Sequence, residues 1–221
     1  ICMKNSRNLL AKETKLAASP LSWLFIVFSL MAFIPRYPIL VSAFFICFGV
    51  FQSFQTSREN NDVLYTVLLP VSKTDAVKAK YRFTVMIQMI AFGVSALFSV
   101  IRMTLMKGVP YADNPLMNAN QTYLAFMLLV FALFNWVFLC GFFKTAYKFG
   151  APFVLFIVLS FVLITAAEVL HHIPGLEFLN DADSIGNPTL WVILAAAFAV
   201  YALVTFLSCR VAMKRFERVD M

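Results

Sequence analysis

The chain has 221 residues, of which 62% are hydrophobic and 13% are charged, whereas a typical soluble domain has roughly 25% charged residues. Because a water-soluble fold of this length could not bury so much Phe, Leu and Val, the composition indicates an all-α integral membrane protein. The net charge of +7 does not indicate nucleic-acid binding, since the basic residues flank apolar runs. The four cysteines are isolated from one another and form no metal or redox motif.

The first 19 residues predict an amphipathic helix that lies in the membrane interface. Apolar or small residues recur there at helical spacing, with basic and amide side chains between them, although Glu13 interrupts the apolar stripe. Such a helix before the first apolar run usually lies on the membrane surface.

Six apolar runs follow and predict six transmembrane helices that form one domain, residues 20–208. The runs cover residues 20–34, 39–54, 83–101, 123–143, 151–167 and 189–208. A bilayer core of about 30 Å takes roughly 20 helical residues, so the first two runs are short. They either cross the membrane with little tilt or form a partly re-entrant hairpin.

The basic residues predict which side of the membrane each loop occupies. Fifteen of the 18 Lys and Arg residues lie in the N-terminus, the second and fourth loops and the C-terminus, and only Arg36, Arg102 and Lys107 lie in the other loops. Lys and Arg accumulate in cytoplasmic loops. We therefore expect both termini, the loop at residues 55–82 and the basic tail at residues 209–221 to be cytoplasmic.

The segment at residues 55–82 is the longest of these cytoplasmic loops. Pro70 predicts a break, and Ser72 with Asp75 three residues later predicts the start of a second helix that runs into the third span. Before the break, four apolar residues at helical spacing predict a short helix: Val63, Leu64, Val67 and Leu68. This helix either docks on another protein or lies on lipid as an interfacial helix.

The same segment resembles a known family. Its motifs are a Glu-Asn-Asn run, a Leu-Pro-Val-Ser run and a basic stretch that ends in Lys-Tyr. The matching residues are Glu59, Asn60, Asn61, Leu69, Pro70, Val71, Ser72, Val77, Lys80 and Tyr81. This pattern between the second and third spans is similar to small ABC-2-type transporter permeases, in particular those of phenol-soluble modulin and bacteriocin exporters. The resemblance covers the N-terminal half, and the C-terminal half agrees only in its number of spans.

The resemblance implies that the chain is the membrane permease of an ABC exporter in a bacterial plasma membrane, with six transmembrane helices and an N-terminal interfacial elbow helix. Two permeases would pair, as identical or related copies, and each would dock a separate ATPase. An amphipathic or antimicrobial peptide is a candidate substrate. The residues expected to couple the permease to the ATPase are Glu59, Asn60, Asp62, Tyr65, Leu68, Leu69 and Pro70.

The chain itself lacks the G-x-x-x-x-G-K-[ST] motif that binds nucleotide phosphates. ATP and Mg would therefore be bound by the partner, and we expect no cofactor and no enzymatic activity in this chain.

Polar residues within the apolar runs are candidates for a substrate path. Gln52, Gln88 and Asn135 either bond neighbouring helices or line such a path. Glu168, His171 and His172 share a helical face, but they provide too few ligands to predict a metal site.

Two other classes of protein remain open on composition. A membrane-embedded enzyme or an accessory factor would need no ATPase, yet the chain has neither an H-E-x-x-H nor a G-x-S-x-G motif. A small ion-coupled carrier would be expected to have charged residues within its spans, and these are almost absent.

Overall fold

The computed structural model describes residues 8–106, 115–145, 147–181 and 184–219. All regular secondary structure in these ranges is helical. The first helix, Asn8–Ala17, ends in the π-helical segment η1 (Glu13–Ala17). The other helices are α2 (Pro20–Leu24) continued by η2 (Phe25–Phe33), α3 (Val41–Glu59), α4 (Asp62–Leu68), α5 (Lys73–Leu105), α6 (Gln121–Phe134) continued by η3 (Asn135–Leu139) and α7 (Cys140–Phe142), α8 (Gly150–Leu170), η4 (Glu177–Asn180), η5 (Ser184–Gly186) and α9 (Pro188–Glu217).

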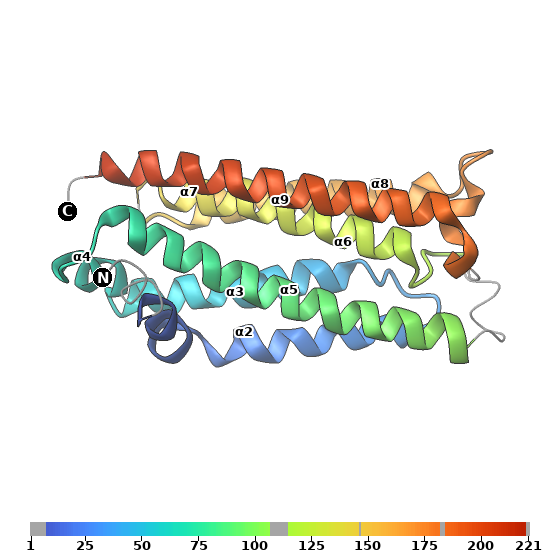
Figure 1. Ribbon diagram of the computed structural model, residues 1–221, viewed down its shortest axis with the longest axis horizontal. Helices are drawn as coiled ribbons and strands as arrows, with labels where there is room; N and C mark the ends of the chain where they lie inside the picture. Colours follow the sequence, from blue (N-terminus) through green and yellow to red (C-terminus); the bar gives the residue numbers. More distant parts are fainter. Residues whose placement is uncertain (1–7, 107–114, 146, 182–183, 220–221) are drawn as a thin grey trace.

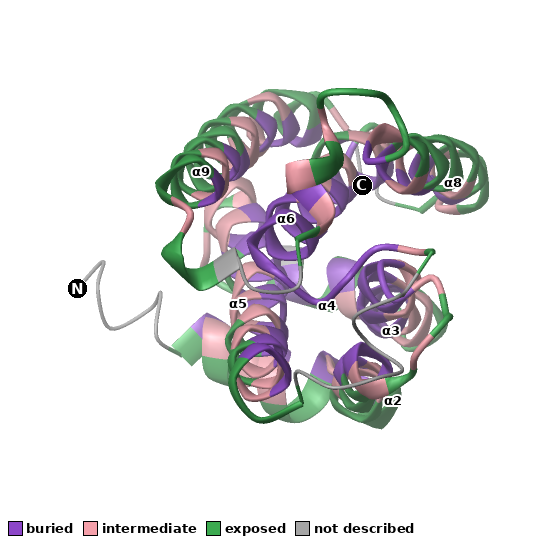
Figure 2. Cartoon of the chain, turned by 90° about the vertical axis from the view of Figure 1, so that its right-hand side faces the viewer, coloured by how far each residue is buried: buried purple, intermediate pink, exposed green. Residues whose placement is uncertain are grey.

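The long helices run side by side as one elongated bundle (Figure 1). Helix α6 lies in the middle and is mostly buried, whereas α8 and α9 lie at the periphery and expose much of their surface (Figure 2). The short helix α4 lies at one end of the bundle, together with the first helix and the C-terminal end of α9 (Figure 1). That end therefore collects the segments in which the sequence places most of the basic residues.

Four helices in the described residues are long and apolar enough to cross a membrane: α5, α6 with its continuation to Phe142, α8 and α9. A fifth span results if the first helix and Pro20–Phe33, which meet at an angle of 94°, are counted together. Helix α3 holds the second predicted run, but its last turns are polar, Gln-Thr-Ser-Arg-Glu, and it does not meet the same criterion. The structure thus supports a multi-pass membrane protein with four or five candidate spans.

Helix boundaries around the predicted cytoplasmic loop follow local chemistry. The hydroxyl of Ser72 accepts a hydrogen bond of 3.1 Å from the backbone N–H of Asp75, which caps the N-terminus of α5. The 33-residue helix α5 then continues without interruption through the third predicted span. At the C-terminus, residues 209–217 of the expected basic tail belong to the end of α9, which extends to Glu217.

The core between α3, η3 and α8 is built from phenylalanine. Phe51 stacks on Phe153 with ring centroids 3.7 Å apart, and Phe138 meets both Phe51 and Phe54 edge to face. Such aromatic pairs add to the stabilisation from buried area. They fix the position of α3, whose C-terminal end leads directly into α4.

Candidate functional site

A sharp turn joins α3 to α4 at the Glu-Asn-Asn motif. Asn60 ends α3, and Asn61 adopts a left-handed backbone conformation with φ 50° and ψ 28°. Asparagine tolerates this conformation better than most residues because its short side chain bonds locally. The motif therefore has a structural reason: Asn61 lets α4 turn away from the axis of α3.

Helix α4 lies at the end of the bundle (Figure 1). This helix and the turn after it expose a group of large apolar side chains. Their exposed fractions are 47% for Leu64, 64% for Tyr65, 74% for Leu68 and 50% for Leu69. We call these four residues the α4 surface. Only the opposite face of the helix packs inward, through Val63 and Thr66, which are buried.

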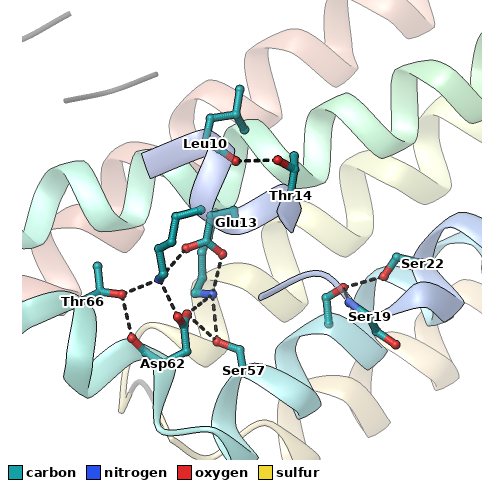
Figure 3. A network of polar contacts seen from close by, with 11 residues as sticks. Leu10, Glu13, Thr14, Ser19, Ser22, Ser57, Asp62 and Thr66 are labelled. Atoms are coloured by element: carbon teal, nitrogen blue, oxygen red, sulfur yellow. Dashed lines mark hydrogen bonds and ion pairs between the residues drawn. The ribbon is translucent and has the colours of Figure 1, made fainter. Parts of the chain in front are cut away.

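The inward face of α4 is held by a cluster of charged and hydroxyl side chains, which we call the Lys80 cluster (Figure 3). Its members come from the first helix, α3, α4 and α5, and they are Lys12, Glu13, Ser57, Asp62, Thr66 and Lys80. Two ammonium groups face two carboxylates, so the cluster has no net charge. It joins four elements that are far apart in the sequence.

Lys80 is the centre of the cluster. Its Nζ lies 2.9 Å from Glu13 Oε2 and 3.1 Å from Asp62 Oδ2, and it donates a 2.9 Å hydrogen bond to the hydroxyl of Ser57. Lys12 Nζ lies 2.5 Å from Asp62 Oδ1 and 3.1 Å from Glu13 Oε1. Glu13 is 3% exposed and Lys80 is 7% exposed, so each charge depends on its partners and not on water.

Asp62 is ionised at neutral pH because of these neighbours. Burial by itself raises the pKa of Asp62, but the charges of Lys80 and Lys12, with hydrogen bonds from Lys12 and Ser57, outweigh burial and hold the pKa below its usual value. The carboxylate also lies in the first turn of α4, near the positive end of the helix dipole.

The predicted coupling residues thus separate into two groups. Six of them are exposed at the end of the bundle: Glu59, Asn60, Tyr65, Leu68, Leu69 and Pro70. The carboxylate of Asp62, by contrast, points into the Lys80 cluster (Figure 3). Its place in the structure is suited to fixing α4 on the bundle, not to contact with another protein.

The predicted substrate-path residues are not all together. Gln88 on α5 and Asn135 at the start of η3 form two reciprocal amide hydrogen bonds of 3.0 Å, and both side chains are fully buried. Tyr201 donates to Gln88 Oε1 at 2.8 Å, and Asn135 also donates to Thr205 Oγ1 at 2.9 Å. We call these four residues the amide network. Gln52 is half-buried on α3 and takes no part in it.

The Lys80 cluster and the interior near the amide network are connected at the Lys-Tyr motif of α5. Lys80 belongs to the Lys80 cluster, whereas the hydroxyl of the next residue, Tyr81, shares a 2.6 Å hydrogen bond with Ser208. Ser208 in turn donates to the backbone carbonyl of Asn135. Neighbouring residues of one motif therefore connect α4 to the interior of the bundle.

Replacement of Asn135 by Leu should destabilise the bundle. It would leave the buried NH2 group of Gln88 without its acceptor, and an unsatisfied buried polar group costs about 1–3 kcal/mol. The free energy of unfolding, measured by SDS titration in mixed micelles, should fall by that amount. Gln52→Leu is the matched control and should change it by less than about 0.5 kcal/mol; equal effects of the two replacements would contradict this role of the network.

Several residues of the Lys80 cluster were not predicted from the sequence. Lys12, Glu13 and Thr66 gave no motif, and Lys80 was noted only as part of a basic stretch. One signal was present: Glu13 interrupts the apolar stripe of the first helix. A carboxylate in such a stripe is expected to have a buried cationic partner, although the sequence does not show which one.

The long apolar helices, packed as one bundle, are those of a multi-pass membrane protein. The comparison with protein families agrees: the model of the "ABC-2 family transporter protein" family matches residues 8–217. The chain belongs to this family, and it is therefore the membrane component, or permease, of an ABC transporter. This membership implies an ABC ATPase as partner and is consistent with a chain that is not itself an enzyme. Neither the curated proteins nor the solved structures contain a match to the chain.

Proposed function

We propose that the chain is an exporter permease and that the α4 surface docks a separate ATPase subunit. The supporting observation is that four large apolar side chains are exposed on α4 and the turn after it, and that α4 lies at the end of the bundle (Figure 1). Exposed apolar groups of this kind mark contact sites for proteins or membranes. An interfacial helix on lipid would lie at the same end of the bundle, so variants of Leu68 and Leu69 are needed to distinguish the two.

The Lys80 cluster provides the rigid connection that coupling needs. A force on α4 reaches α5 through the contact of Asp62 with Lys80, because both carboxylate oxygens of Asp62 are held by ammonium groups. Glu13 adds the first helix to the same unit. We infer that α4, the N-terminal end of α5 and the first helix move together when the ATPase changes shape.

In this proposal the end of the bundle that carries α4 faces the cytoplasm of a bacterial cell. The support is the excess of Lys and Arg in the segments gathered there. Pro20–Phe33 and α3 then form the first two of six spans, and the first helix forms an interfacial elbow. A cysteine introduced at Asp181 should react with an impermeant maleimide in intact cells, and one at Ser72 should not; the reverse result would refute the orientation.

We further propose that two permeases pair, as identical or related copies, and that an amphipathic peptide is exported. Both follow from the resemblance of residues 59–81 to peptide-exporter permeases, and the buried amides of Gln88 and Asn135 are the candidate substrate-path groups that open in another state.

The proposed function is tested by reconstitution with an ABC ATPase from the same genome. The two proteins, co-expressed and purified in detergent, should elute as one complex. In proteoliposomes, ATP should drive movement of a fluorescent synthetic amphipathic peptide across the membrane. An ATPase variant that lacks the P-loop lysine is the control. A permease that neither binds this ATPase nor any ATPase expressed with it would refute the proposal.

A further inference from the structure

A groove of about 660 Å³ lies between α5 and α9, away from the α4 surface. Lys78 and Arg82 of α5 line one end of it. Met89 of α5 and Phe198 of α9 line the other end, and Tyr201 and Cys209 form part of the wall. The groove is apolar apart from its basic end.

The basic end is built from two side chains on one helix face. Lys78 and Arg82 are four residues apart, so they lie one above the other. Lys78 pairs with Asp75 at 3.3 Å, but the two side chains are 43% and 33% exposed. A pair so open to solvent is weak, and an anionic group can therefore share the ammonium of Lys78 with Asp75.

The length of the groove corresponds to half of a bilayer. Lys78 and Met89, at its two ends, are eleven residues apart on one continuous helix, which is about 16 Å at a rise of 1.5 Å per residue. The hydrocarbon core of a bilayer is about 30 Å thick. The groove thus extends from a basic rim near the membrane surface to about the middle of the membrane.

From this charge and length we propose that the groove binds an anionic phospholipid. The phosphate would lie between Lys78 and Arg82, and one acyl chain would follow the apolar wall towards Met89 and Phe198. Basic pockets between membrane helices bind anionic headgroups in this way. That the lipid comes from the inner leaflet rests on the proposed orientation, whereas the binding itself does not.

The wall of the groove suits an acyl chain, because it is formed mostly by apolar side chains. A lipid in the groove would also contact the amide network through Tyr201, because Tyr201 lines the groove and donates a hydrogen bond to Gln88.

Native mass spectrometry of the purified chain, mixed with phosphatidylglycerol or phosphatidylcholine, tests the proposal. The wild type should retain phosphatidylglycerol with about tenfold preference over phosphatidylcholine. The double variant Lys78→Gln, Arg82→Gln should lose this preference. The variant Ala202→Trp, which fills the groove without a change of charge, should lose bound phosphatidylglycerol as well. Lys144→Gln with Lys148→Gln is the control: it removes the same charge from exposed positions outside the groove and should bind normally.

Alkylation of Cys209 by N-ethylmaleimide gives a second measurement. Cys209 lines the groove, whereas Cys47 and Cys140 are buried; Cys2 lies outside the described residues and is replaced by Ser. Phosphatidylglycerol should slow alkylation in the wild type and not in the Lys78, Arg82 variant.

The proposal is wrong if the control loses as much binding as the groove variants, or if both lipids bind equally. It is also wrong if a synthetic amphipathic peptide protects Cys209 and phosphatidylglycerol does not, which would make the groove a peptide path. No ATPase takes part in these measurements, so their failure would leave the proposed function standing.

Discussion

Replacement of Leu68 and Leu69 by Asp should release the ATPase from the permease. Both leucines are at least half exposed at the end of the bundle, where a partner would bury them. A side chain that is a hot spot of an interface costs about 2 kcal/mol or more when it is removed, and two new carboxylates would also have to lose water. We expect an affinity loss of more than about 100-fold, measured by biolayer interferometry with purified ATPase and permease in detergent.

The matched control for this experiment lies at the opposite end of α5. Leu105 and Met106 are also exposed, 79% and 39%, and their replacement by Asp introduces the same two charges. ATPase affinity should not change in that variant. If Leu68→Asp with Leu69→Asp still binds the ATPase in detergent but loses stability in liposomes, α4 rests on lipid and the docking proposal is wrong.

Replacement of Lys80 by Met should have the largest effect on stability. It removes the cation between two buried carboxylates and leaves Glu13 and Asp62 with Lys12 alone. Removal of one partner from a buried ion pair typically costs about 3–5 kcal/mol. The loss should appear in SDS titrations of the free energy of unfolding. The same change at half-exposed Lys78 should cost less than about 1 kcal/mol.

Two further variants separate a charge effect from a packing effect. Glu13→Gln combined with Lys80→Met removes one charge of each sign and should recover part of the loss. Asp62→Asn should destabilise the protein at pH 7, and the difference from wild type should shrink below about pH 4. The direction follows because the pKa of Asp62 is lowered in the folded state: its stabilisation is complete above the unfolded pKa and is lost as the pH falls through the folded pKa. If no second substitution reduces the loss of stability caused by Lys80→Met, that loss reflects packing and not charge.

Local signals in the sequence predicted the helices around the site well. Pro70 ends the segment of α4, Ser72 caps α5, and the apolar run of residues 83–101 lies within α5. These are effects between residues a few positions apart, which a sequence shows directly. The composition predicted a membrane protein equally well.

Contacts between distant segments could not be predicted in the same way. The apolar spacing of residues 63–68 predicted a helix, but it did not show that Val63 faces inward while Leu64 and Leu68 are exposed. Asp62 was expected among the residues that couple the permease to the ATPase. Its partners are 50 and 18 residues away, and only the fold brings Lys12 and Lys80 to it.

Because α5 is one unbroken helix, a tilt at one end of it displaces the other end. Lys80 and Arg102 are 22 residues apart on this helix, which is about 33 Å. A tilt of about 5° around Lys80 would therefore move Arg102 by about 3 Å, more than a hydrogen bond can stretch. Arg102 donates to the carbonyl of Ala32 at 2.7 Å and to Asn118 at 2.9 Å. In the proposed function, a small rotation of α5 at the ATPase would either displace the C-terminal end of η2 together with Arg102 or break this contact, and it would thereby open the bundle at the opposite end.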